Sequence, residues 1–323
     1  MLLISISAVV FGVAALVWGS DRFVLGASVT ARNLGVPTLV VGLTVVGVGT
    51  SAPEITVSTM AALGGNPGVA VGSAVGSNIA NIGLVTGVCA LVNPVSVKSE
   101  VLRREFPLMF LVIALSWFVL NDGFLGFSDG LWLMASFAAL LGVIVRTAAS
   151  AEGSDPLTME LKQHIPSDMT TGVAIIWLSA GLLLLLLGSR LIVWGAVGLA
   201  GALGLSDLVI GLTVVAVGTS LPELAASVAS VLKSEPDLAI GNVLGSIMFN
   251  LLPVLAAPGL IAPGPIEAAV LSRDMPVMMF MSVALFLMAS GFRRPGRINR
   301  LEGAILLAAF AGYQGMFLFS AGI

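Results

Sequence analysis

Charged residues, cysteine and histidine are scarce in this chain. Only 10% of its 323 residues are Asp, Glu, Lys or Arg, against about 25% in soluble globular proteins. In contrast, 58% are hydrophobic and the mean hydropathy is +1.09. The single cysteine, Cys89, excludes an intramolecular disulfide, and the single histidine, His164, lies in a polar stretch. The composition excludes an ordinary soluble protein and predicts one that crosses a membrane several times, with the lipid bilayer and not nucleic acid as its partner.

Long hydrophobic runs fill most of the sequence. A bilayer core about 30 Å thick needs about 20 mostly apolar residues per helix, and the chain offers ten such segments. They are 2–30, 37–63, 67–93, 105–121, 127–147, 171–200, 206–232, 237–262, 274–291 and 300–320. The first has no positively charged start, so it is interpreted as a spanning helix and not a cleaved signal. The longest polar connection, 148–170, separates five spans from five.

The sequence contains an internal repeat. Gly42–Glu54 (GLTVVGVGTSAPE) returns as Gly211–Glu223 (GLTVVAVGTSLPE), and Gly76–Asn81 (GSNIAN) returns as Gly245–Asn250 (GSIMFN). Each pair of equivalent positions differs by 169 residues. Because each copy has an odd number of spans, the second must enter the membrane from the opposite side. We therefore predict an all-α membrane protein with ten transmembrane helices in two inverted five-helix repeats, 1–147 and 171–323, joined by the polar loop 148–170.

The positive residues indicate the orientation. With the ten spans as drawn, twelve Lys and Arg residues fall on one side and only Arg190 and Arg273 on the other. Cytoplasmic loops carry the excess of positive charge in membrane proteins. The central loop is predicted inside the cell, and both termini outside the cytoplasm.

Two glutamates lie inside predicted spans, at matched positions of the two copies. Glu54 follows Pro53, and Glu223 follows Pro222. A carboxylate near the bilayer centre costs about 2.5–3.5 kcal/mol on insertion scales, so an intramembrane glutamate indicates a functional site. Proline also lacks the N–H that would bond the carbonyl four residues earlier. Helices 2 and 7 are therefore predicted to be discontinuous, with freed carbonyl oxygens beside each glutamate.

Neutral oxygens surround these glutamates in the sequence. Hydroxyls flank each break, and each copy adds a serine and an asparagine four residues apart on one helical face. These residues are Thr50, Ser51, Thr219, Ser220, Ser77, Asn81, Ser246 and Asn250. Taken singly, such residues often make only local or interhelical hydrogen bonds, but a buried carboxylate pair needs cations or protons for compensation. Oxygen ligands without imidazole or thiolate favour Ca²⁺ or Na⁺ over zinc or copper.

These motifs resemble those of the cation/calcium exchanger superfamily, and more closely the bacterial inner-membrane calcium/sodium antiporters. The resemblance covers nearly the whole chain. It implies that Glu54 and Glu223 ligate a central ion, with carbonyls of Gly47 and Ala216 contributing. It also implies that the hydroxyls and Asn81 support them, and that helices one and six slide past the core. Several relatives have Asp where this chain has Asn250, so the similarity suggests exchange independent of potassium.

The expected function is secondary antiport of Ca²⁺ outward against Na⁺ inward, in the inner (plasma) membrane. It needs no cofactor and no enzyme chemistry. Ca²⁺/H⁺ exchange on the same fold is the alternative, since a buried glutamate can carry a proton instead of Na⁺. A cation channel is a rival of another class, because rings of Glu also form cation filters. A membrane enzyme lacks a nucleophile–base pair, and a scaffold leaves the matched glutamates unexplained.

Overall fold

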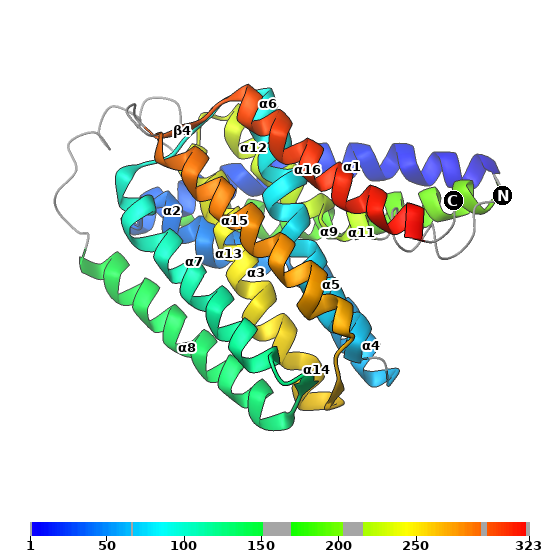
Figure 1. Ribbon diagram of the computed structural model, residues 1–323. Coiled ribbons are helices and arrows are strands. Elements are labelled where there is room, and N and C mark those ends of the chain that lie inside the picture. The colour runs from blue at the N-terminus through cyan, green and yellow to red at the C-terminus, as the bar shows by residue number, and fades with distance from the viewer. Residues whose placement is uncertain (1, 66, 151–168, 203–215, 292–295, 321–323) are drawn as a thin grey trace.

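The protein is helical almost throughout in its computed structural model, which describes residues 2–65, 67–150, 169–202, 216–291 and 296–320 (Figure 1). The first half contains α1 (Leu2–Leu34), α2 (Thr38–Val41), η1 (Gly42–Val46), α3 (Gly47–Thr50), α4 (Ala52–Leu63), α5 (Pro67–Ala80), η2 (Asn81–Val85), α6 (Thr86–Val92), β1 (Val95–Ser96), α7 (Ser99–Leu120), β2 (Phe124–Leu125) and α8 (Phe127–Ser150). The elements labelled η are π-helical turns.

The second half follows a similar order, with η7 as an additional π-helical turn. It contains α9 (Thr171–Ala202), α11 (Ala216–Thr219), α12 (Leu221–Leu232), α13 (Pro236–Phe249), η6 (Asn250–Val254), α14 (Leu255–Ile261), β3 (Gly264–Pro265), η7 (Val270–Asp274), α15 (Met275–Ser290), β4 (Arg297–Ile298) and α16 (Arg300–Ser320). The elements from α3 to β1 in the first half correspond to those from α11 to β3 in the second. Each begins and ends 169 residues before its counterpart. The sequence repeat is therefore also a repeat of local structure.

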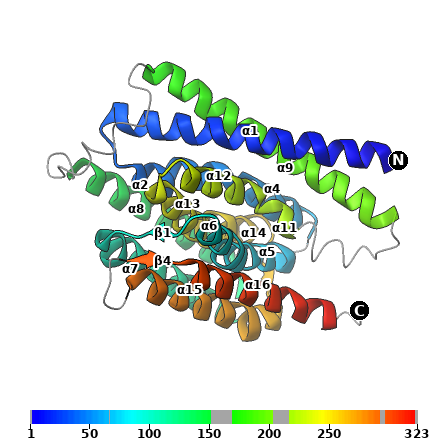
Figure 2. The ribbon, with the colours of Figure 1, turned by 90° about the horizontal axis from the view of Figure 1, so that it is seen from above.

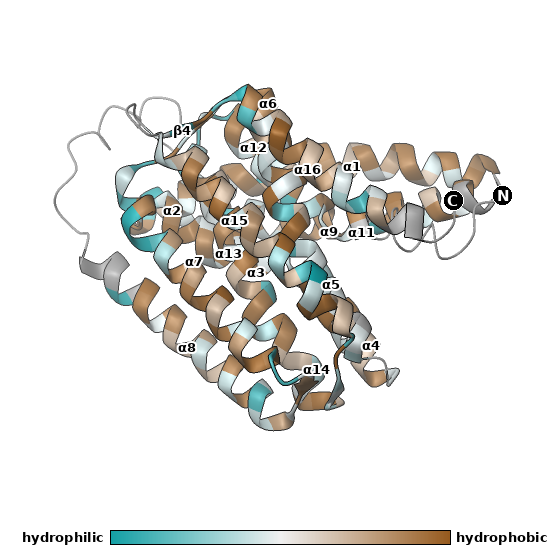
Figure 3. Ribbon diagram, viewed as in Figure 1, coloured by the Kyte–Doolittle hydropathy of each residue, from teal (hydrophilic) through white to brown (hydrophobic). Residues whose placement is uncertain are grey.

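The described residues include six helices long and apolar enough to cross a membrane, or seven if the bent pair Thr38–Thr50 and Ala52–Leu63 counts as one span. Apolar residues cover most of these helices, and hydrophilic residues gather mainly near their ends (Figure 3). This pattern is that of a protein embedded in lipid. The chain is a mostly helical membrane protein.

The predicted break in the second span is present. The two helices on either side of Ser51 are bent by 43°, and Pro53 lies in the first turn of the second one, α4. In the other copy, Ser220 separates α11 from α12 in the same way. The start of the predicted span 206–232 and most of the predicted polar loop, 151–168, lie outside the described residues. Helix α8 extends a few residues beyond its predicted end.

Helices α1 and α9 pack against each other along one flank of the molecule (Figure 2). A Cβ atom placed on Gly12 would lie 2.8 Å from the carbonyl oxygen of Gly188, and one on Gly188 would lie 2.8 Å from that of Gly12. Gly19 and Gly181 approach each other in the same reciprocal way, at 3.1 and 2.8 Å. Residue numbers rise along one helix as they fall along the other, so these counterpart helices are antiparallel.

Several further contacts between the halves are also reciprocal. Strand β1 pairs with β4 and β2 with β3, both antiparallel. Helix α6 packs on α16 through Gly87 and Gly303, and α14 packs on α8 through Gly259 and Gly130. Helices α6 and α14 are counterparts, as are α8 and α16. Each of these two helix contacts therefore repeats the other with the halves exchanged. Helix α13, buried at every described position from Leu238 onward, runs through the centre of this arrangement.

Candidate cation site

The two glutamates lie in the first turns of α4 and α12, just after the breaks. Pro53 and Pro222 are the second residues of these helices, because proline fits the first turn, where its missing N–H is not needed. Glu54 and Glu223 are each only 1% exposed. A carboxylate at a helix N-terminus is favoured by the helix dipole, which offsets part of the cost of its burial.

The two copies meet at the carboxylates. The hydroxyl of Ser51 donates to Oε1 of Glu223 over 3.1 Å, and Thr50 also contacts the Glu223 carboxyl group. In return, Thr219 contacts the carboxyl group of Glu54. The two carboxyl groups lie close enough to interact electrostatically. The structure therefore brings both halves of the predicted site into one cluster.

Helices α5 and α13 supply the second part of the cluster. Ser77 donates to Oε1 of Glu54 over 3.4 Å, and Ser246 occupies the equivalent position of α13. Asn81 and Asn250 are the first residues of the π-helical turns η2 and η6. Such single-turn insertions are frequent at functional sites, because they redirect side chains and backbone.

Several polar atoms here are buried without a hydrogen-bond partner among the described residues. They are Oε2 of Glu54, Oε2 of Glu223, Oγ of Ser220, Oγ of Ser246, Oδ1 of Asn250, and both Oδ1 and Nδ2 of Asn81. An unsatisfied buried polar group costs about 1–3 kcal/mol, so their concentration in one place needs compensation. All but one are oxygen atoms, and a hard cation such as Ca²⁺ or Na⁺ binds this type of atom. Within the described residues, no group of three or more Asp, Glu, His or Cys side chains could hold a metal.

The carbonyl oxygens follow the prediction only in part. The Gly218 carbonyl, which Pro222 leaves without its helical partner, accepts a hydrogen bond of 2.7 Å from Ser189 of α9, so it is already engaged in protein contacts. The Gly47 carbonyl accepts the Ser51 N–H over 3.1 Å. A Cβ on Gly47 would lie 3.2 Å from the backbone of Gly245, so this glycine also permits close approach of α3 to α13. Ala216 is the first residue of α11.

Two glycines of α13 allow close packing against the second span of the other half. Cβ atoms on Gly241 and Gly245 would lie 2.6 and 2.5 Å from the carbonyl oxygens of Leu39 and Leu43. The counterparts of these glycines in α5 are Gly72 and Gly76. Their corresponding neighbours would be residues 208 and 212, which lie outside the described residues.

Sequence reasoning did not single out Asn242. This fully buried side chain donates to the Glu223 carbonyl (3.3 Å) and to Ser227 Oγ (2.8 Å), and it accepts from Thr50 Oγ1 (3.1 Å). Asn242 thus connects the helix break before α4 with the helix break before α12. Asn242 lies four residues before Ser246, on the same helical face. This spacing is the one signal that could have revealed it, because its counterpart in the repeat is Ser73 and not a second amide.

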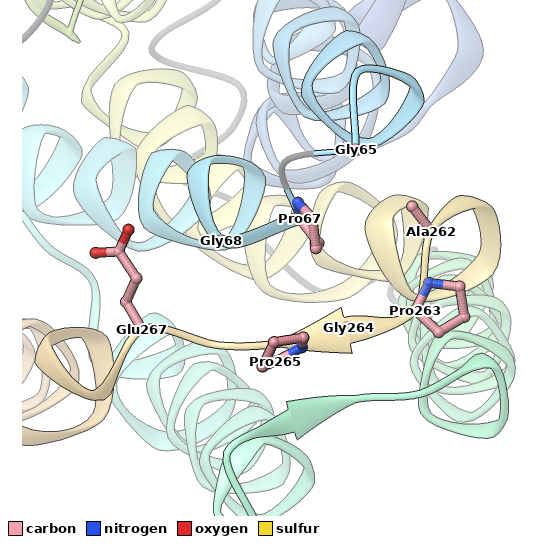
Figure 4. Close-up of a pocket in the computed structure, with 8 residues that line it drawn as sticks. All are labelled: Gly65, Pro67, Gly68, Ala262, Pro263, Gly264, Pro265 and Glu267. Atoms are coloured by element: carbon pink, nitrogen blue, oxygen red, sulfur yellow. The ribbon is translucent and has the colours of Figure 1, made fainter.

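A separate concavity of about 460 Å³ opens beside the turn between α4 and α5. Gly65, Pro67 and Gly68 line one side and residues 262–265 and Glu267 the other (Figure 4). The counterparts of Gly68 and Glu267 are Asp237 and Lys98, whose charged groups form an ion pair of 2.6 Å. This concavity lies outside the glutamate cluster.

Helices that are broken near buried polar oxygens, in a membrane protein built from two repeats, are typical of secondary transporters. The chain belongs to the sodium/calcium exchanger family, which it matches over residues 4–146 and 173–319. It is 48% identical to CaxA of Alkalimonas amylolytica, covering 97% of this chain and 98% of that protein. It is 42% identical to the inner membrane protein YrbG of Escherichia coli, covering 98% and 97%.

Solved structures agree with this membership. The sodium-calcium exchanger NCX_Mj, soaked with Na⁺ and without Ca²⁺, superimposes with a TM-score of 0.83 at 34% identity, covering 96% of this chain and 98% of that one. The family and its relatives support antiport of cations that include Ca²⁺, and they are transporters and not enzymes.

Proposed function

We propose that this protein exchanges Ca²⁺ for Na⁺ across the inner membrane, by alternating access to a site around Glu54 and Glu223. The observation that carries the proposal is the group of unpartnered buried oxygens, contributed by both copies at once. The ligands are the two carboxylates, the hydroxyls of Thr50, Ser51, Ser77, Thr219, Ser220 and Ser246, the amides of Asn81 and Asn250, and backbone oxygens of Gly47 and Ala216.

The reciprocal contacts support ten helices in two inverted repeats, 1–147 and 171–323, with 148–170 as the connection. Counterpart helices α1 and α9 are antiparallel, as expected when the second copy enters the membrane from the opposite side. The exchanged strand pairs β1–β4 and β2–β3 have the same explanation. Inverted repeats give a transporter two related conformations, each open to one side. With the positive loops inside, both termini lie outside the cytoplasm.

Exchange follows from competition for one set of oxygens. When the site is empty, two buried carboxylates face each other without compensation, and burying unpaired charge is costly. Bound Ca²⁺ supplies two positive charges, and Na⁺ ions supply them one at a time. If the empty site cannot reorient, it returns to the other side of the membrane only after it has released one ion and bound the other. The expected direction is Ca²⁺ outward against inward Na⁺.

Ca²⁺/H⁺ exchange is the second candidate, and the same carboxylates favour it. Protonation neutralises a buried glutamate as Na⁺ does. The relative affinities of the site for Na⁺ and H⁺ therefore decide which ion drives Ca²⁺ transport. A channel fits less well, because a helix broken at each glutamate is typical of transporters with alternating access.

Flux measurements in proteoliposomes test the proposal. We expect ⁴⁵Ca uptake when the vesicles contain Na⁺ and the external medium does not, with loss of uptake when the Na⁺ gradient is collapsed. Uptake driven by a proton gradient alone would establish the H⁺ alternative. Downhill Ca²⁺ flux without any counter-ion would contradict exchange and support a channel.

A further inference from the structure

Asn78 has no counterpart in the repeat. The residue 169 positions later is Ile247, although the serines and asparagines on either side of this position recur. Asn78 is fully buried in α5, where an amide must be hydrogen-bonded to offset its desolvation. The partner of its Nδ2 group is the carbonyl oxygen of Ile247 itself, at 3.2 Å. Helices α5 and α13 therefore meet at equivalent positions, and only one of them is polar.

The contacts of Asn78 determine the orientation of two amides. A backbone carbonyl can only accept a hydrogen bond, so Asn78 must turn its Nδ2 toward Ile247. Its second Nδ2 contact, the Met278 sulfur at 3.5 Å, is also an acceptor. Oδ1 of Asn78 is then left facing Asn250, whose Nδ2 donates to it over 3.0 Å.

Asn250 consequently presents oxygen to the site. With its Nδ2 bonded to Asn78, its Oδ1 points the other way and has no partner in the described part of the chain. A reversed amide would place an NH₂ group toward the cation, and NH₂ can only donate. Reversal would also put Oδ1 of Asn250 against Oδ1 of Asn78. One buried hydrogen bond therefore decides whether Asn250 attracts or repels a cation.

We propose that Asn78 is a positioning residue that holds the Asn250 amide with its oxygen toward the transported cation. This inference rests on the proposed cation site, because it needs Asn250 to face the ion. Asn78 itself does not touch the ion, since both ends of its amide are engaged by protein atoms. Its effect on ion affinity passes through Asn250 alone.

A double-mutant cycle tests this dependence in proteoliposomes. The variants are Asn78→Leu, which has similar volume and no amide, Asn250→Ala, and the two combined. We expect Asn78→Leu to raise the half-saturating Na⁺ and Ca²⁺ concentrations about three- to tenfold, as for one lost hydrogen bond. In the Asn250→Ala background the same change should alter them less than about twofold, because no amide is left to orient.

Two results would overturn the inference. One is an unchanged affinity in Asn78→Leu alone, and the other is an equal loss in both backgrounds, as expected if Asn78 only supports packing. Should Asn78→Leu not fold, Asn78→Ser replaces it, because its shorter side chain cannot reach Asn250. Melting temperatures of detergent-solubilised variants separate misfolding from weakened binding.

The Glu54→Gln variant separates a failure of the proposed cation site from a failure of the proposed role of Asn78. Retained exchange in that variant contradicts the site around Glu54 and Glu223, and with it the role of Asn78, although exchange itself would be retained. If Glu54→Gln is inactive and the cycle is additive, only the role of Asn78 is excluded.

Discussion

The two copies supply matching polar side chains to the candidate site but do not hold them in the same way. Each contributes a glutamate, hydroxyls and an asparagine at matched positions. The buried amides that fix them are unmatched: Asn242 corresponds to Ser73, and Asn78 to Ile247. Both amides hold residues of the second copy, since Asn242 bonds the Glu223 carbonyl and Asn78 bonds Asn250. The repeat thus supplies the polar groups of the candidate site, whereas residues that are not repeated hold them in place.

The largest expected effect concerns the two glutamates, which the copies have at matched positions. Glu54→Gln and Glu223→Gln should each reduce Na⁺-dependent ⁴⁵Ca uptake to the level of empty liposomes, because either change removes half of the charge that binds Ca²⁺. Glu267→Gln, at the separate concavity, is the matched control and should transport normally. Near-normal exchange in either intramembrane variant contradicts the assignment of the site.

The next effect concerns Asn242, a buried amide that the first copy lacks at the equivalent position. Asn242→Ala removes three hydrogen bonds beside the breaks and should weaken apparent Ca²⁺ affinity about 10–100-fold, as for residues that orient metal ligands. Ser73→Ala, at the counterpart position, should stay within about twofold. Equal effects in ⁴⁵Ca uptake titrations of both variants would mean that the copies hold their ligands alike.

A smaller effect, on the melting temperature, should be similar for equivalent positions of the two copies. A Cβ atom added at Gly26, or at its counterpart Gly195, would clash with backbone atoms of the facing helix in the α1–α9 pair. Alanine at either position overpacks this interface, which costs about 1–3 kcal/mol, so both variants should melt at lower temperature by similar amounts. Gly142 in α8 is exposed and has no described atom within 4 Å of an added Cβ. Gly142→Ala should therefore leave the melting temperature unchanged or slightly raised.

The smallest effect depends on pH. Glu235 lies in the turn before α13, where burial, and then the nearby Asp237, raise its pKa above the ordinary value. Its protonated form is favoured in the folded protein, so this contribution to stability is present at low pH. It is lost as pH rises through the pKa of the folded state. Glu235→Gln should flatten this trend, changing the melting temperature by under about 2 °C. A steeper trend in the variant would contradict the sign.

Much of the fold was predictable because lipid imposes simple rules. Apolar runs of sufficient length become helices, and Pro53 and Pro222 lie just after the ends of the preceding helical segments, since proline cannot donate the backbone hydrogen bond that continues a helix. The bend at Ser51 and the elements on either side of Ser220 accordingly lie where the sequence places them. The expected free carbonyl of Gly218 is bonded by Ser189 instead, since a contact from a helix distant in sequence leaves no local signal.

The sequence by itself determined the membrane class, the repeat of 169 residues, and the oxygen chemistry around Glu54 and Glu223. These follow from composition, spacing and the cost of burying charge, which are local properties. Only the tertiary structure decided that Ser51 bonds Glu223, that α1 and α9 are antiparallel, and that Asn78 orients Asn250. The physical reason is that a hydrogen bond depends on where two helices cross, and that crossing is a property of the packed molecule.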